Sequence, residues 1–388
     1  MAKLLMITGL GSARDLASGK KGAFYNTLEE FHKYWERIDI IAPKIKGQKQ
    51  KIKELFGNVF VHISPWPLIF HPLWFLKKGL EIFRKEKFDL MTVQEFPPFY
   101  NGIGARMLWR KIKVPYVLEI HHIPGYPKAA SWKEKFYRNL TGRFIKYDAA
   151  KAVAVRTVNQ NQVPDFLKKA GVPAEKIKFI PSLYIDLETF RPMDPPAGGG
   201  KEYDLIFVGR LVENKGINLF LETVKKLDAK AIIVGDGPLA LDIKLKIEKW
   251  KLKITFHGWA KDAAEVSRLI NKSKVLMMPS YNEGGPRVVV EAMACGVPVL
   301  ATPVGIVQDI IKDKESGRII NWQAEDMVAK AKELLSNAVE YEKYRQAGIE
   351  IAKNFERKEA IKNYAEQLKQ ISHTTHSRPS TDRSGIFE

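Results

Sequence analysis

Two series of short apolar segments, separated by stretches of helix length, constrain the fold more than any other feature of the chain. The first series comprises 3–8, 39–42, 59–63, 89–93, 116–120 and 152–155, and the second begins near residues 204, 231, 254, 275 and 298. Short apolar strands that alternate with helices are typical of parallel sheets covered by helices on both faces. The sequence therefore predicts an α/β fold with two doubly wound parallel sheets.

A segment rich in proline and glycine, 192–200, separates the two series. Proline stiffens such a segment and glycine loosens it, so no regular element is expected there. With 388 residues, 45% of them hydrophobic, the chain is long enough to bury two cores. We expect an N-terminal domain over 1–192, a hinge linker over 193–200 and a C-terminal domain over 201–355.

The C-terminal part of the sequence contains an amphipathic segment followed by a polar one. Residues 355–368 have the spacing of an amphipathic helix, and we place this helix at 356–372. The last segment, 373–388, is rich in Ser, Thr and Arg and has too little apolar content to pack. We therefore expect a disordered tail over 373–388.

A strand–loop–helix–strand unit is predicted in the second series. Residues 274–280 form an apolar run that ends in Pro and Ser, as a buried parallel strand does, and Pro286 suits the first position of a following helix. Gly296 ends that helix, and the apolar run 297–301 supplies the next strand. Because open parallel sheets bind ligands at the carboxyl ends of their strands, we expect a ligand site after residue 280.

Two carboxylates, Glu283 and Glu291, lie on either side of the loop-to-helix junction in this unit. Glu283 is in the loop, and Glu291 lies in the helix about one and a half turns past Pro286, so each can face a different part of one extended ligand. Gly284 and Gly285 have no side chain that would hold a substrate away. The unpaired amides of the first helical turn form a partial positive pole that suits phosphate or sugar oxygens. The unit therefore predicts a site for a sugar nucleotide.

A second candidate site lies upstream, where the strand 203–208 enters a glycine turn that carries Arg210 and Lys215. A planar guanidinium and a mobile ammonium are what a pyrophosphate leaving group needs, because negative charge grows on it as the glycosidic bond breaks. Ordinary surface charge on a lysine-rich chain is the alternative explanation for these two residues.

Together these residues resemble family 4 of the GT-B glycosyltransferases, the retaining, nucleotide-sugar-dependent glycosyl group 1 enzymes. The family signature is a Glu, seven residues, a second Glu and an Ala-Met-Ala-x-Gly-x-Pro-Val-like run, and Glu283 through Val299 reproduces it. Residues 235–238, Gly-Asp-Gly-Pro, match the family's Gly-x-Gly-Pro turn. The resemblance implies two Rossmann-like domains that face each other across a cleft, the N-terminal one on the acceptor side. It also implies that the helix 356–372 crosses back onto the first domain.

The resemblance implies a role for each residue of the two candidate sites. Glu283 would hold the donor sugar through its hydroxyls and stabilise positive charge at the ring, and the amides of Gly284–Gly285 would contact sugar or phosphate. Glu291 would accept the ribose hydroxyls. Arg210 and Lys215 would neutralise the departing diphosphate. A phosphate oxygen is thought to take the acceptor's proton in this family, so a dedicated side-chain base is not required.

Two histidines follow the strand 114–120 at the carboxyl edge of the first predicted sheet. Many family members carry a histidine after a strand that Pro initiates, near the reacting end of the donor sugar, and by counting from Pro115 His121 aligns best. His122 is the rival, because adjacent side chains on a strand point to opposite faces and only one can face the cleft. A capping or packing role is the alternative for His121.

The first half of the chain departs from the family in places. Residues 19–23, Gly-Lys-Lys-Gly-Ala, are the candidate for the family's glycine loop over the donor phosphates, with an ordinary surface loop as the alternative. The family's Asn-Gly-x-Asp loop is replaced by Ile-Pro-Ser-Leu-Tyr-Ile-Asp over 180–186, so no role is carried over to that segment. Residues 9–12, Gly-Leu-Gly-Ser, lack the third glycine of the dinucleotide fingerprint and predict only a turn.

No metal and no cofactor are expected, since the nucleotide sugar would be a substrate. The eight His and one Cys show no metal-ligand spacing. The single cysteine, Cys295, excludes an intramolecular disulfide, and no signal-peptide pattern precedes the first strand, so we expect a cytoplasmic protein. No apolar run approaches the ~20 residues that span a bilayer.

The charge balance predicts a polyanionic partner, because the formal net charge is +19. No nucleic-acid motif or aromatic platform is present, so nucleic acid is not expected as a partner. Residues 71–85 and 132–146 both mix Trp, Phe and Leu with Lys and Arg, as helices that lie on an anionic membrane surface do. They can equally be domain helices with the aromatic side in the core. If the membrane alternative holds, the acceptor is lipid-linked, because both segments belong to the acceptor-side domain.

The function that the resemblance implies is a retaining glycosyltransferase (EC 2.4) that moves a hexose-type sugar from a nucleoside diphosphate donor to a hydroxyl of a glycan or glycolipid. A GT-B nucleotide-sugar epimerase is an alternative, and nucleoside diphosphate release that depends on an added acceptor would exclude it. A non-catalytic protein that binds sugar nucleotides or anionic surfaces would show no turnover. A nucleic-acid binder would show steeply salt-dependent binding.

Overall fold

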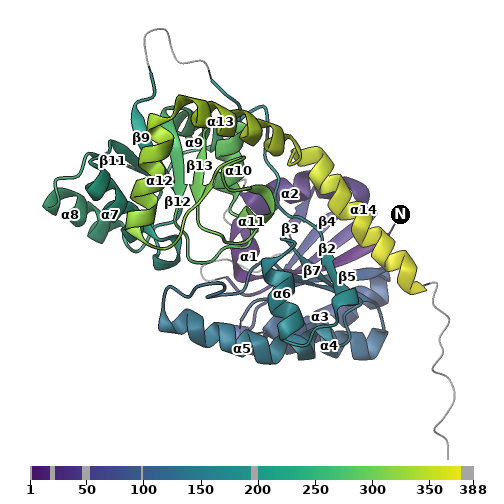
Figure 1. Cartoon of the computed structure of the whole chain (residues 1–388). Coiled ribbons are helices and arrows are strands. Elements are labelled where there is room, and N and C mark those ends of the chain that lie inside the picture. The colour runs from purple at the N-terminus through teal and green to yellow at the C-terminus, as the bar shows by residue number, and fades with distance from the viewer. Residues whose placement is uncertain (1, 18–21, 46–52, 98, 194–199, 377–388) are drawn as a thin grey trace, which may run out of the picture.

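The chain folds into two lobes, each built around one sheet (Figure 1). The computed structural model describes residues 2–17, 22–45, 53–97, 99–193 and 200–376. The first sheet has the order β3-β4-β2-β1-β5-β6-β7-β8, and the second has the order β11-β10-β9-β12-β13-β14. All pairings are parallel except that of β3 with β4. The predicted fold class, two doubly wound parallel sheets, is confirmed.

The strands of the first lobe are β1 (Lys3–Ile7), β2 (Arg37–Ala42), β3 (Lys53–Leu55), β4 (Val59–Ile63), β5 (Leu90–Gln94), β6 (Tyr116–Ile120), β7 (Ala154–Thr157) and β8 (Ile177–Phe179). Those of the second are β9 (Tyr203–Val208), β10 (Ala231–Val234), β11 (Ile254–Gly258), β12 (Ser273–Met278), β13 (Val299–Ala301) and β14 (Arg318–Ile319). The three strands that the sequence analysis missed, β3, β8 and β14, each have two or three residues and lie at sheet edges, where little apolar pattern is needed.

The helices are α1 (Leu10–Ala17), α2 (Ala23–Phe31), α3 (His71–Glu86), α4 (Tyr100–Ile112), α5 (Trp132–Ala149), α6 (Gln162–Lys169), α7 (Ile217–Leu227), α8 (Ala240–Lys249), α9 (Ala263–Asn271), α10 (Arg287–Ala294), α11 (Val307–Ile310), α12 (Ala324–Ser336), α13 (Ala338–Lys353) and α14 (Arg357–His376). A short 3₁₀ helix, η2 (Leu68–Phe70), precedes α3.

Alternate residues of each central strand enter different cores, which is why the strands are continuous apolar runs. In β1, Leu5 and Ile7 pack with α3, α4, α5 and α6, whereas Leu4 and Met6 pack with α1, α2 and α14. In the second lobe, one face of the sheet packs with α9 and α10 and the other with α7, α8 and α12. Each sheet is therefore buried on both faces, as parallel sheets require.

The last helix returns to the first lobe. In Figure 1, α14 (yellow) runs from α13 in the second lobe across the first. Its Tyr364 stacks on Phe31 of α2 with ring centroids 4.8 Å apart, and the Tyr364 hydroxyl donates to the Glu119 carboxylate of β6 at 2.6 Å. This is the crossing that the resemblance implied.

The predicted tail begins too early. The helix continues to His376, so residues 373–376 of the tail expected over 373–388 are helical, and 377–388 lie outside the described residues. Once a helix is anchored by its packed turns, each further residue adds a hydrogen bond without a new nucleation cost, so polar residues can extend it. Residues 194–199 of the predicted hinge also lie outside the described part of the chain.

A buried cation organises the first lobe beneath α14. Arg156 of β7 is buried, and its guanidinium donates to the Glu119 carboxylate at 2.7 Å and to the carbonyl of Ile180 at 2.9 Å. The Tyr364 ring lies 3.8 Å from the guanidinium carbon. Buried charges are tolerated only when they are paired and hydrogen-bonded, and Arg156 is satisfied by groups from β6, α14 and the segment after β8.

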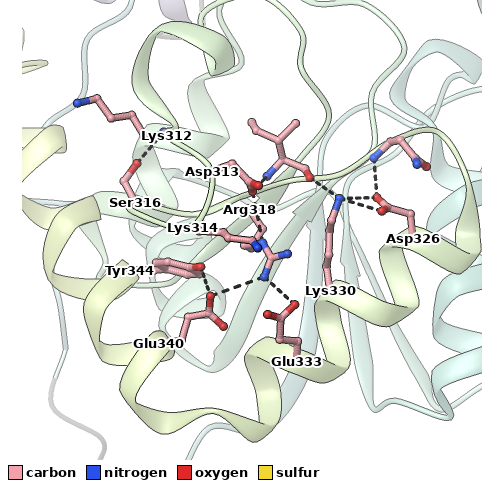
Figure 2. A network of polar contacts seen from close by, with 12 residues as sticks. Lys312, Asp313, Lys314, Ser316, Arg318, Asp326, Lys330, Glu333, Glu340 and Tyr344 are labelled. Atoms are coloured by element: carbon pink, nitrogen blue, oxygen red, sulfur yellow. Dashed lines mark hydrogen bonds and ion pairs between the residues drawn. The ribbon is translucent and has the colours of Figure 1, made fainter.

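A second charged cluster ties the edge of the other sheet to its helices (Figure 2). Arg318 of β14 contacts Asp313 at 3.3 Å, Glu333 of α12 at 2.7 Å and Glu340 of α13 at 3.6 Å. Lys330 of α12 donates to the carbonyl of Ile319 at 2.8 Å. The two-residue strand β14 is thereby fixed by side chains rather than by a long ladder.

Two carboxyl groups meet inside the first lobe without a cation between them. Glu95 follows β5, Asp148 is near the end of α5, and both are buried beside Gly102, whose amide donates to Glu95. Burial and the neighbouring Asp148 raise the pKa of Glu95 well above its usual range. Burial raises the pKa of Asp148 to about 7, an effect that Arg106 opposes. At least one of the two carboxyl groups therefore holds a proton near neutral pH.

We predict that Asp148 contributes stability that is lost as pH rises from about 4 to about 7, and that Asp148→Asn removes this contribution from the pH dependence of unfolding. The ordinary pKa of Asp148 is 3.8 and the folded value is about 7, so in this window the folded state retains a proton that the unfolded chain releases. One retained proton corresponds to about 1.4 kcal/mol per pH unit. Urea unfolding across this pH range measures the slope, with Asp165→Asn, an exposed carboxylate of α6, as the control. Identical slopes in wild type and Asp148→Asn would contradict the prediction.

Candidate functional site

The candidate site lies at the carboxyl edge of the second sheet, between β9 and β12. The chain runs from β9 to β10 and β11 on one side and then returns to β12 on the other side of β9. The loops that follow β9 and β12 diverge at such a switch point and leave a crevice for ligands. Both predicted sites come from these two loops, which explains why segments more than sixty residues apart in sequence meet.

The loops after β9 and β12 are locked together. Lys215 forms an ion pair with the Glu283 carboxylate, which also accepts a hydrogen bond from the Ser280 hydroxyl at 3.1 Å. The amide of Tyr281 donates to the carbonyl of Asn214 at 2.8 Å. Gly216 has φ 68° and lies against the carbonyl of Pro279, where any Cβ would overlap that oxygen. Lys215 and Glu283 are therefore held in a fixed relation.

The Glu283 loop also meets the first lobe. A Cβ at Gly284 would overlap the carbonyl oxygen of His121, so bare backbone is required at this contact. The Asn159 side chain donates to the carbonyl of Gly284 at 3.3 Å. Gly285, by contrast, has open space where its side chain would be. Of the two predicted glycines, one thus permits the lobes to touch and the other leaves a free surface beside the helix α10.

Asn282 is a third link between the lobes, and its role was not predicted from the sequence. Its buried amide donates to the Glu134 carboxylate of α5 at 2.9 Å and to the carbonyl of Lys128 at 3.2 Å. The Lys128 ammonium lies 5.5 Å from the centre of the Tyr281 ring and 5.0 Å from that of Trp322. The segment before α5 is therefore clamped onto the loop that carries Glu283. In the sequence, only its position beside Glu283 pointed to Asn282, because its hydrogen-bond partners, Glu134 and Lys128, are distant in the chain.

Arg210 is exposed and lines a separate cavity of about 300 Å³, with Gly209, Gly235 and Trp259 among the other lining residues. Gly235 lies so close to Gly209 that a Cβ would overlap its carbonyl oxygen, which accounts for the Gly-x-Gly-Pro turn. The guanidinium of Arg210 forms no ion pair or hydrogen bond with any described residue. The structure thus joins Lys215 to Glu283 directly, whereas Arg210 lines a cavity to which neither of these two residues contributes.

Glu291 lies in α10, which begins at Arg287, one residue later than predicted, with Pro286 at its N-cap. Burial raises the pKa of the Glu291 carboxyl to about 7, and the nearby Arg287 opposes this shift. Arg287 itself lies over the ring of Tyr184 from the first lobe, 4.8 Å from its centre. Among the described residues the Glu291 carboxyl has no hydrogen-bond partner, so it is available to a ligand.

The two histidines after β6 face different surroundings, as the alternation of strand side chains requires. The ring Nε2 of His121 lies 3.9 Å from the Glu119 carboxylate, and burial lowers the pKa of His121 to about 4. Burial also lowers the pKa of His122, and the charges that act on it are those of Glu283 and Lys215. Of the two histidines, His122 is the one on which the charges of Glu283 and Lys215 act, and its Cβ lies close to the backbone of Gly284. The alignment of His121 with the family's histidine stays a prediction, because counting from Pro115 cannot show which side of the strand faces the cleft.

The described parts of two further segments, the candidate glycine loop at 19–23 and the segment 180–186, contact residues of the first lobe. Residues 19–21 of the candidate glycine loop lie outside the described residues. Gly22 packs against Asp15, whose carboxylate accepts a hydrogen bond from the amide of Phe24 at 2.6 Å. Within 180–186, the carbonyls of the first two residues accept hydrogen bonds from Arg156.

No cluster of three or more potential metal ligands occurs among the described residues. Within the same residues, every helix is too short or too polar to cross a bilayer.

Two family models match the chain: "Glycosyltransferase Family 4" over residues 24–183 and "Glycosyl transferases group 1" over residues 194–354. An uncharacterised glycosyltransferase of Methanocaldococcus jannaschii is 26% identical over 325 residues, which cover 82% of this chain and 86% of the relative. An Escherichia coli enzyme named UDP-Gal:alpha-D-GlcNAc-diphosphoundecaprenol alpha-1,3-galactosyltransferase is 27% identical over 259 residues, 62% of this chain and 64% of that enzyme.

Solved structures show the same fold at low identity. Sucrose-phosphate synthase from Thermosynechococcus elongatus superposes with a TM-score of 0.79 at 19% identity, over 97% of this chain and 100% of that one. Anabaena HepE, in complex with UDP and glucose, superposes with a TM-score of 0.69 at 17% identity, over 95% of this chain and 100% of that one.

We predict that Gly284→Ala pushes the two lobes apart and that Gly285→Ala does not. The added methyl at Gly284 would overlap the His121 carbonyl oxygen, whereas the same methyl at Gly285 meets nothing within 4 Å. Overpacking of this kind costs about 1–3 kcal/mol. Small-angle scattering measures the separation of the lobes, and thermal unfolding measures the loss of stability. Equal scattering curves and equal unfolding midpoints for the two variants would show that the contact at Gly284 does not set the distance between the lobes.

Proposed function

We propose that this chain, which belongs to the GT-B glycosyltransferases of family 4, transfers a hexose-type sugar from a nucleoside diphosphate donor to a hydroxyl of a glycan or glycolipid, with retention of anomeric configuration. The observation that carries the proposal is the Lys215–Glu283 pair at the switch point of the second sheet, facing the first lobe. It combines a cation for a leaving phosphate with a carboxylate for the sugar.

The donor would span the edge of the second sheet. Its diphosphate would lie between Lys215 and Arg210, where the two cations stabilise the negative charge that grows on the leaving group. The cavity of about 300 Å³ beside Arg210 would take the nucleoside base, and Trp259 supplies an apolar surface there. The unpartnered carboxyl of Glu291 would accept hydrogen bonds from the ribose hydroxyls.

The sugar would lie between the lobes. Glu283 is held by Ser280 and Lys215, so its carboxylate is oriented before the donor arrives and can bind sugar hydroxyls and stabilise positive charge at the ring. His122, on which the charges of this pair act, would contact the sugar from the first lobe, with His121 as the alternative that alignment favours. The acceptor would enter from the first lobe, and a phosphate oxygen would take its proton. These steps require no metal.

We predict that Glu283→Gln and Lys215→Ala each lower kcat for transfer by about 10²-fold or more, because each removes charge that is placed for the transition state. A panel of nucleotide sugars identifies the donor by thermal shift and by donor hydrolysis, after which transfer is measured by release of nucleoside diphosphate. NMR of the product's anomeric proton measures retention. Glu248→Gln, an exposed carboxylate of α8, is the control. A Glu283→Gln variant with the wild-type rate would refute the site, and diphosphate release without an acceptor and with an altered sugar would identify an epimerase.

We also propose that the enzyme works at the cytoplasmic face of a membrane, with α5 on an anionic lipid surface. Trp132 is 74% exposed and Phe136 is 58% exposed, and Phe144 is exposed on the same helix, which also carries Lys133 and Arg138. The other candidate, 71–85, behaves as a domain helix, since its aromatic residues pack into the core. The E. coli relative is named for a lipid-linked acceptor.

We predict that the chain co-sediments with vesicles that contain phosphatidylglycerol and much less with pure phosphatidylcholine vesicles. The double variant Trp132→Ser/Phe136→Ser should lower the bound fraction severalfold, because it removes apolar area that would enter the headgroup layer. Leu241→Ser/Leu245→Ser, a pair of exposed leucines on α8, is the matched control. High salt should weaken binding. Equal sedimentation of the two double variants would contradict a role for α5.

A further inference from the structure

We propose that the acceptor carries an apolar group near its reacting hydroxyl, and that this group binds in a cavity of the first lobe, here called the acceptor cavity. The inference rests on the proposed function and adds the chemical class of the acceptor. The acceptor cavity has a volume of about 290 Å³, and its walls include Leu10, Leu68, Phe96 and Tyr100, with Thr8 among its polar residues. None of the donor-site residues lines it.

The acceptor cavity occupies the switch point of the first sheet. The chain runs from β1 to β2 and β4 on one side and then returns to β5 on the other side of β1. Thr8 follows β1 directly, and Phe96 lies two residues after β5. This is the edge at which open α/β sheets bind ligands, so the cavity holds the same position in the first lobe that the donor loops hold in the second.

The walls and the mouth of the acceptor cavity are apolar. Phe96 at the mouth is 54% exposed, and Leu10 is 37% exposed. Beyond Leu68, the next two residues of η2, Ile69 and Phe70, are also exposed. Large apolar side chains that gather at the mouth of a pocket mark a binding surface rather than ordinary scatter. Leu10 and Phe96 thus offer exposed apolar surface to a hydrocarbon chain at the cavity itself, and Ile69 and Phe70 extend this surface next to Leu68 in the chain.

One polar atom in the acceptor cavity lacks a partner. Thr8 is fully buried, and its hydroxyl has no hydrogen-bond partner among the described residues. The neighbouring Asn101 uses its amide on the carbonyls of Thr8 and Gln94, at 3.3 and 2.7 Å. A buried hydroxyl without a partner is costly, and an oxygen of the acceptor would satisfy it. The cavity thus suits a molecule that is mainly apolar and carries an oxygen at one point.

The acceptor cavity is connected to the proposed donor site through Phe96 and His122. The ring of Phe96 contacts that of His122, with centroids 5.7 Å apart. His122 in turn lies within the electrostatic reach of Glu283 and Lys215. An apolar group in the cavity would therefore hold the attached hydroxyl beside the sugar end of the donor site. Both a membrane lipid and a soluble amphiphile present this chemistry.

The first test uses methyl, butyl, hexyl and octyl β-D-glucosides below their micellar concentrations, with binding measured by calorimetry on the full chain. We expect affinity to rise with tail length, by up to about fourfold for each methylene that enters the cavity. Leu68→Glu should weaken octyl glucoside binding by at least about tenfold, and Leu68→Trp should weaken it by filling space. Leu245→Glu, the same change on the exposed surface of α8, should leave it unchanged. A flat series, or equal binding by wild type and both Leu68 variants, overturns the inference.

UDP binding by wild type is measured in parallel, because it reports the donor site alone. If the chain bound no nucleoside diphosphate but its affinity for the glucosides still rose with tail length, the proposed function would be refuted and the apolar binding cavity would stand. Binding of UDP with a flat series would refute the cavity alone. The source of the ligand is tested with octadecyl glucoside in phosphatidylcholine vesicles. If wild type binds octadecyl glucoside in vesicles and Leu68→Glu does not, the ligand is a membrane lipid. Binding that is confined to the monomeric glucosides supports a soluble amphiphile.

Discussion

The contact of the Gly284 backbone with the His121 carbonyl is the constraint on which the rest of the site depends. It brings the loop that carries Glu283 against the end of β6, so the donor loops and the first lobe share one boundary. Asn282 and Asn159 secure the same boundary through hydrogen bonds to Glu134 and to Gly284. Because a side chain at Gly284 would occupy this space, the close approach of the lobes is set by backbone rather than by adjustable side chains.

The two lobes place their binding surfaces by the same topological rule. In each sheet the chain first builds strands on one side of its initial strand and then crosses to the other side, which leaves a crevice at the carboxyl edge. In the second lobe charged and polar groups fill this edge, among them Lys215 and Glu283. In the first lobe Leu10, Leu68 and Phe96 occupy it. The same topology thus produces a polar surface in the second lobe, which suits the proposed donor, and an apolar surface in the first lobe, which suits the proposed acceptor.

Much of this arrangement could be predicted from the sequence, because it is encoded locally. The central strands are apolar runs, and the unit from Glu283 to Val299 carries its own strand, loop and helix signals. Contacts between distant segments could not be predicted in this way. Nothing near Asn282 indicates Glu134, and counting along β6 could not separate His121 from His122, since adjacent positions differ only in the face they present. The short edge strands were missed because two or three residues carry too little apolar pattern, and in β14 the side chain of Arg318 supplies contacts to the neighbouring helices instead.

The return of α14 has a consequence for biosynthesis. Arg156 and Glu119 are buried under Tyr364, which the ribosome adds more than two hundred residues after Arg156. While the chain is being made, the amino-terminal half therefore exposes Phe31 and its neighbours and leaves the guanidinium without its aromatic cover. Domains commonly fold in order of synthesis, but this one can close its core only after Tyr364 has been synthesised. Until then, the apolar surface around Phe31 is the part of the nascent polypeptide most exposed to misfolding and aggregation.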